Sequence, residues 1–79
     1  MSIFDFISVS QKRAFLESSR ESLALELAQI LIRLGIDPEV FSLENFNINE
    51  YEQYGETAFR IAQIKDAIDL TNAKLANLG

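Results

Sequence analysis

The amino-acid sequence predicts an all-α protein: an antiparallel hairpin of two long helices that dimerises into a four-helix bundle. Apolar residues recur at helical spacing over two long stretches, and Gly35 lies between them as a helix terminator. The first stretch also carries more apolar surface than one hairpin can cover. We therefore expect a single domain over 1–79, divided into an apolar N-terminal arm (1–8), a helix (9–34), a short connecting helix (38–43) and a second long helix (48–77).

The first long helix has clear signals at both of its ends. Ser8 and Gln11 have the spacing of a capping box, in which each side chain accepts a hydrogen bond from the other residue's backbone N–H. At the other end Gly35 suits the left-handed position that follows a helix, and Ile36 can fold back onto Leu31. These signals place the helix between the two caps.

A short helix is predicted directly after this end, in the stretch "IDPEVF". Asp37 is a favourable N-cap and Pro38 a favourable first helical residue. Ile36 is placed to contact Phe41 as a hydrophobic staple across the helix start.

The same type of signal recurs in "FNINEY", at the start of the second long helix. Asn47 is the predicted cap, Glu50 reaches back to it, and Phe46 contacts Tyr51. The helix is expected to cross Gly55 at a cost of ~1 kcal/mol relative to alanine. Its apolar seam recurs at the a and d spacings of helix-on-helix packing and comprises Tyr54, Ile61, Ile68 and Leu75 with Thr57, Ile64, Thr71 and Leu78.

The first helix, which includes the stretch "LALELAQILIRLGI", carries two apolar stripes. At 100° per residue, one stripe matches the seam of the second helix and comprises Leu16, Leu23, Leu27, Ile30 and Leu34. We expect the other stripe to bind a second chain, and it comprises Ala24, Leu25, Ala28 and Ile32. The alternative is that the N-terminal arm "IFDFI" of the same chain covers this second stripe.

The composition argues against an enzyme. The chain has neither histidine nor cysteine, the side chains that acid–base and nucleophilic catalysis use most readily. Its three glycines form no phosphate-binding loop. The carboxylates of Glu50, Glu52 and Glu56 match no calcium-loop spacing, so we expect no metal and no cofactor.

The net charge of −5 is concentrated in the middle of the chain, where residues 34–59 contain no lysine or arginine. A nucleic-acid binder needs the opposite sign, so we expect no direct binding to nucleic acid. We expect instead an acidic surface with aromatic anchors that docks a basic surface of another protein. The predicted docking residues are Glu44, Phe46, Glu50, Tyr51, Glu52, Tyr54 and Glu56.

Two functions are consistent with these features. The first is a small non-enzymatic interaction module, an adaptor or assembly protein that self-associates as a homodimer. The alternative is an acidic inhibitor or nucleic-acid mimic of the phage or mobile-element type, which occupies a basic cleft of its target through residues that include Glu39. The sequence has no secretory signal pattern and no apolar run long enough to span a membrane, so we expect a cytoplasmic protein that does not bind membranes.

Overall fold

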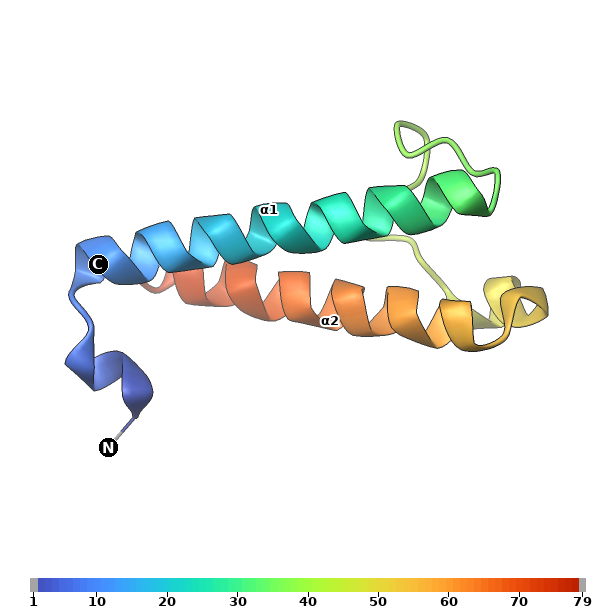
Figure 1. The fold of residues 1–79 in the computed structure, drawn as a ribbon. Coiled ribbons are helices and arrows are strands. Elements are labelled where there is room, and N and C mark those ends of the chain that lie inside the picture. Colours follow the sequence, from blue (N-terminus) through green and yellow to red (C-terminus); the bar gives the residue numbers. More distant parts are fainter. Residues whose placement is uncertain (1, 79) are drawn as a thin grey trace.

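The computed structural model describes residues 2–78 and is a helical hairpin. Helix α1 (Val9–Arg33) and helix α2 (Glu56–Ala76) run antiparallel and side by side (Figure 1). Two 3-10 helices, η1 (Ile3–Phe6) and η2 (Ile48–Tyr54), each precede a long helix. Because residues 2–78 form helices and no strand, the predictions of an all-α fold and of a hairpin are confirmed.

Helix α1 begins and ends with the predicted caps. The Gln11 backbone N–H donates to Ser8 Oγ at 3.2 Å, and the Ser8 N–H donates to Gln11 Oε1 at the same distance. At the C-terminal end the Ile36 N–H donates to the Leu31 carbonyl at 2.9 Å, and Gly35 has a φ of 78°. This is the glycine-terminated Schellman arrangement, which satisfies carbonyls that the helix leaves without partners.

The prediction of a short helix over 38–43 is wrong, because residues 38–40 form only a turn. The Asp37 carboxylate accepts a hydrogen bond from the Glu39 N–H at 2.9 Å, as an N-cap would, but no helix follows. Phe41 and Leu43 both pack against the core. Residues two apart share a side only in extended backbone, so their packing is incompatible with a helix through them.

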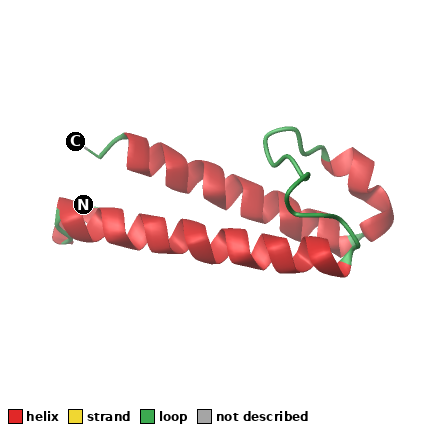
Figure 2. Ribbon diagram, turned by 90° about the horizontal axis from the view of Figure 1, so that it is seen from above, coloured by secondary structure: helices red, strands yellow, loops and turns green. Residues whose placement is uncertain are grey.

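The prediction of one continuous helix over 48–77 is also wrong, because Gly55 separates η2 from α2 (Figure 2). Gly55 has φ 58° and ψ −127°, a conformation open to glycine and strained for other residues. Asn47 does cap η2, accepting from the Asn49 N–H at 3.0 Å. The turn at Gly55 lets η2 fold back so that Tyr51 packs against the core.

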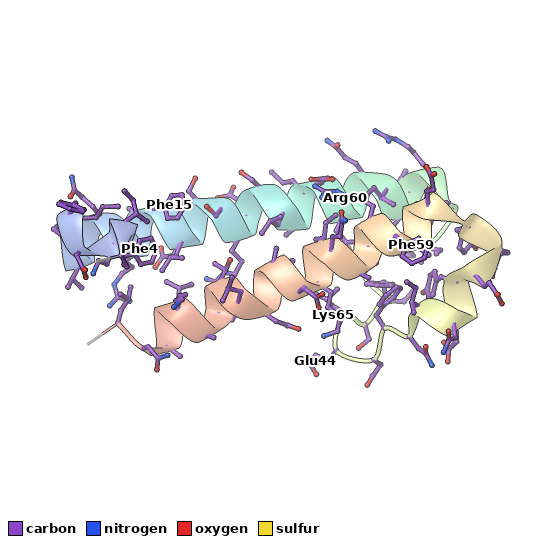
Figure 3. All side chains as sticks on the ribbon, turned by 90° about the horizontal axis from the view of Figure 1, so that it is seen from below. Phe4, Phe15, Glu44, Phe59, Arg60 and Lys65 are labelled. Carbon is purple, nitrogen blue, oxygen red and sulfur yellow. The ribbon has the colours of Figure 1, made fainter. Side chains whose placement is uncertain are left out.

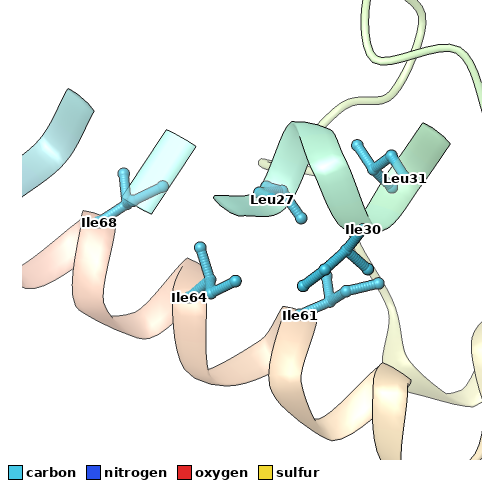
Figure 4. Close-up of a cluster of buried hydrophobic side chains, with 6 residues drawn as sticks. All are labelled: Leu27, Ile30, Leu31, Ile61, Ile64 and Ile68. Carbon is cyan, nitrogen blue, oxygen red and sulfur yellow. The ribbon is translucent and has the colours of Figure 1, made fainter. Parts of the chain in front are cut away.

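The core lies between the facing sides of α1 and α2 (Figure 4). Its six buried side chains are Leu27, Ile30, Leu31, Ile61, Ile64 and Ile68. Burying one leucine or isoleucine completely is worth about 1.5–3 kcal/mol. The connecting segment closes one side of this core, with Ile36, Phe41, Leu43 and Phe46 packed against it.

Candidate functional site

The outer face of α1, which we define as Ala24, Leu25, Ala28 and Ile32, points away from α2. Leu25 is 58% exposed and Ile32 is 66% exposed, whereas Leu27 and Leu31 beside them in the sequence are buried. Leu25 and Ile32 are seven residues apart and therefore lie on the same side of the helix, two turns from each other. Ala24 is exposed and Ala28 is half-buried. The four residues predicted as the self-association interface therefore form an uncovered apolar strip.

The N-terminal arm does not cover this strip. It folds against the first turns of α1, where the Phe4 ring meets the Phe15 ring edge-on at a centroid distance of 6.2 Å (Figure 3). The Lys12 ammonium lies 5.7 Å from the centre of the Phe4 ring, an attractive cation–π geometry. The intramolecular alternative for the outer face is therefore wrong, because the arm packs at the opposite end of the helix from Ile32.

The hairpin exposes more surface than a compact monomer of its size. Its accessible surface is 5694 Å², whereas monomeric proteins of 8.9 kDa expose about 4,800 Å². Its radius of gyration is 14.6 Å, with extents of 43 × 22 × 18 Å, and a compact chain of this length would measure about 12 Å. The excess of about 900 Å² is close to the ~800 Å² that each partner buries in a standard protein–protein interface.

The aromatic residues predicted to dock a partner form a cluster with one another and with Phe41. Centroid distances are 5.0 Å between Phe46 and Tyr51 and 5.7 Å between Tyr51 and Tyr54. All these rings are half-buried, and Phe46 and Tyr51 pack against the core. Their contacts thus hold η2 and the connecting segment on the hairpin, and their role in docking stays a prediction.

The acidic side chains of residues 34–59 lie toward the loop end of the hairpin, except that Glu44 lies near the middle of α2. We call these six side chains the acidic end, and all six are exposed. They are Asp37, Glu39, Glu44, Glu50, Glu52 and Glu56. Glu44 lies beside Lys65 of α2 (Figure 3). The pKa of Lys65 is raised, first by its hydrogen bond to Asp69 at 2.8 Å and in small part by Glu44.

Sequence reasoning missed an open groove between the C-terminal half of α1 and the start of α2. Its volume is about 540 Å³, and Glu26, Arg33, Thr57 and Arg60 are among the residues that line it. The hydrogen bond from Arg60 lowers the pKa of Glu26. Glu26 is therefore a stable carboxylate at neutral pH, held by a cation, and is poorly suited to donate or accept a proton in catalysis. The pair joins residues 34 positions apart, which no local pattern could reveal.

The described part of the chain, residues 2–78, contains no group of three acidic side chains arranged to hold a metal ion. Neither of its long helices is apolar enough over a sufficient length to cross a bilayer.

The fold and these surfaces define a small helical hairpin with an uncovered apolar strip along one helix and an acidic end. No protein-family model matches the chain, and no match was found among curated proteins or among solved structures.

Proposed function

We propose that the protein is a non-enzymatic interaction module that self-associates through the outer face of α1. The observation that carries the proposal is the excess surface of the hairpin, which is about the size of one partner's share of an interface. Small domains that cannot bury enough apolar surface alone are stabilised by disulfides, metals or association. Without cysteine, no disulfide is available to this chain.

The position of the strip constrains how two hairpins would meet. Because Leu25 and Ile32 lie on the side of α1 away from α2, association through them sets α1 against the second copy's α1, with both α2 helices outside. A closed four-helix bundle would instead bury the sides where the two helices of each hairpin meet. One of those sides carries the ion pair between Glu26 and Arg60, and removing such a pair from water carries a desolvation penalty of several kcal/mol per ion. A flat row of four helices is the arrangement that the surface favours.

The test is a double substitution in the strip. Leu25→Glu with Ile32→Glu would put four charges into the dimer interface, so the variant should elute as a monomer where the unaltered protein is a dimer by light scattering. The matched control is Phe59→Glu with Leu70→Glu, two residues of similar exposure on the outer side of α2. It should remain dimeric. A monomeric unaltered protein at high micromolar concentration would refute the proposal.

A second candidate function is docking of a basic protein at the acidic end. It is favoured by the exposure of all six carboxylates of residues 34–59, with no lysine or arginine in the segment that carries them. Such an interaction steers association and weakens as salt screens it. A steep loss of binding with salt would favour the nucleic-acid mimic, since a mimic depends on charge for most of its affinity.

Charge reversal tests this second candidate. Glu50→Lys with Glu52→Lys should abolish capture of a basic partner identified with the unaltered protein by mass spectrometry, while leaving helicity unchanged. Glu17→Lys with Asp66→Lys changes the net charge equally at exposed positions outside the acidic end and should leave capture intact. Equal loss in both variants would indicate nonspecific charge attraction and contradict a docking surface.

A further inference from the structure

A second, smaller pocket lies where η2 meets the first turn of α2. Its volume is about 230 Å³. The residues that line it belong to η2, to α2 and to the turn between them, and are Ile48, Asn49, Glu52, Gly55, Ala58 and Phe59. Because pockets for small-molecule ligands measure ~300–1,000 Å³, this pocket is better matched to one long side chain.

The pocket combines an apolar floor with an aromatic ring and a carboxylate. Ala58 is 2% exposed and Ile48 is half-buried, so these two side chains form the floor. Phe59 lies on the first turn of α2 (Figure 3) and is 64% exposed, and Glu52 of η2 is exposed as well. The ring and the carboxylate are therefore both open to a partner.

This combination suits a cation, and an arginine side chain more than a lysine. A cation is attracted to the face of an aromatic ring, and the chain shows this at its other end, where the Lys12 ammonium lies 5.7 Å from the centre of the Phe4 ring. The planar guanidinium of arginine can stack on a ring and also donate two hydrogen bonds to a carboxylate. Its aliphatic stem can cover an apolar floor.

The basic residues of the chain that follow the pocket most closely are engaged elsewhere. Arg60 donates to both carboxylate oxygens of Glu26, at 2.6 and 2.7 Å. Lys65 donates to Asp69 at 2.8 Å. All six pocket residues belong to the segment 34–59, which contains no lysine or arginine. A cation for the pocket is therefore expected from another molecule.

We propose that this pocket receives an arginine side chain of a basic protein, with the guanidinium stacked on the Phe59 ring and paired with the Glu52 carboxylate. The proposal rests on the docking function proposed above for the acidic end and names the residue type that is recognised there. The exposed carboxylates of the acidic end attract a basic surface as it approaches. The pocket then fixes one arginine of that surface in a defined position.

Titration of the full chain with N-acetylargininamide, followed by NMR, tests the pocket. The backbone amides of Glu52, Gly55 and Phe59 should show saturable shifts, and the Hδ protons of the probe should move upfield under the ring current of Phe59. N-acetylcitrullinamide has the same shape without the charge and should cause no saturable shift. N-acetyllysinamide has the same charge and should bind more weakly, because an ammonium neither stacks nor pairs through two parallel hydrogen bonds. Equal affinity for the lysine probe would overturn the preference for arginine.

Substitution of the ring separates stacking from simple charge attraction. Phe59→Leu keeps an apolar side chain but removes the aromatic face, so it should weaken binding of the arginine probe about two- to fivefold and abolish the upfield shift. Phe59→Trp should bind the probe at least as tightly, since tryptophan is the best cation–π partner. The matched control is Phe15→Leu, at a 55% exposed phenylalanine on α1, which should change neither value. An upfield shift that persists in Phe59→Leu would overturn the proposal.

Failure of the pocket and failure of docking give different results. Shifts that spread over Asp37, Glu39 and Glu50 without saturating would indicate diffuse charge attraction and overturn the pocket. Docking would still stand if an identified basic protein were captured and lost in Glu50→Lys with Glu52→Lys. Saturable binding of the probe without capture of any basic protein would overturn docking and the proposed source of the arginine. Capture that is weakened by Phe59→Leu would support both.

Discussion

Arg60 of α2 holds both carboxylate oxygens of Glu26 of α1. Its Nε donates to Oε2 at 2.6 Å and its Nη2 donates to Oε1 at 2.7 Å. The two side chains stay 46% and 40% exposed, so water screens the attraction between them. Two parallel hydrogen bonds nevertheless require a defined geometry, and the pair therefore fixes how the middle of α1 sits against the first turns of α2.

The ion pair makes stability depend on pH in the acid range. Because the pKa of Glu26 is lowered in the folded protein, its contribution is present above its ordinary value of 4.5 and is lost as the pH falls through the lower, folded value. Glu26→Gln should therefore be less stable than the unaltered protein at pH 7 and equally stable near pH 2. Urea midpoints measured by circular dichroism across this range check the prediction, with Glu17→Gln as the exposed control. A difference in urea midpoint between Glu26→Gln and the unaltered protein that does not change with pH would assign the effect to packing.

The core is small enough for one truncation to matter. Ile64 is fully buried, and replacing it with alanine should cost about 2–5 kcal/mol, through lost burial and the cavity left behind. Leu70, which is 60% exposed on the same helix, is the matched control and should change stability by about 0.5 kcal/mol or less. Chemical denaturation of both variants, followed at 222 nm, measures the difference. Similar losses in the two variants would mean that α2 packs with a different face.

Gly55→Ala distinguishes the observed turn from a continuous helix. In a continuous helix the substitution should stabilise the protein by about 1 kcal/mol. At φ 58° and ψ −127°, outside the left-handed helical region, an L-residue is strained by about 1–3 kcal/mol, so the structure predicts a loss of stability instead. Gly35→Ala, at φ 78° in the left-handed position after α1, should lose about 1–2 kcal/mol. Thermal unfolding of the two variants gives the sign directly, and a gain for Gly55→Ala would favour the continuous helix.

Removing the N-terminal arm should leave self-association unchanged. Deleting residues 1–7 removes the contact between Phe4 and Phe15 and should lower the unfolding temperature slightly, since aromatic pairs are worth about 0.5–1.5 kcal/mol beyond their burial. The number of chains per assembly, measured by light scattering, should stay the same. The measured mass should fall only by the mass of the deleted residues. Phe15→Ala should reproduce the thermal effect without shortening the chain. A change in the number of chains would place the arm in the interface.

Local signals predicted the ends of α1 well, because their chemistry is local. The caps at Ser8 and Gly35 depend on hydrogen bonds between residues at most five positions apart. The segment 38–43 carries an equally good start signal, yet its backbone follows the core contacts of Phe41 and Leu43. Packing of a few large side chains outweighs the preference of six residues for a helix, because a helix that short is costly to nucleate.

The candidate site, like the fold, could be predicted in part from the sequence. Spacing alone identified Leu25 and Ile32 as a strip apart from the core, because angular position on a helix follows directly from sequence number. Leu31 lies outside the predicted core stripe, and its burial depends on the connecting segment that closes over it. The pairing of Glu26 with Arg60 depends on the register between α1 and α2, which the sequence of either helix does not specify.

Gly55 has a consequence for handedness. The mirror image of its backbone angles, φ −58° and ψ 127°, falls in a region that ordinary L-residues occupy readily. A D-amino acid is thus matched to this position where every L-residue is strained. D-alanine at position 55, introduced by chemical synthesis, would restrict the unfolded chain more than glycine does and should stabilise the fold by about 0.4–1 kcal/mol. The turn between η2 and α2 is in this sense a site where the chain uses an achiral residue in place of one of opposite chirality.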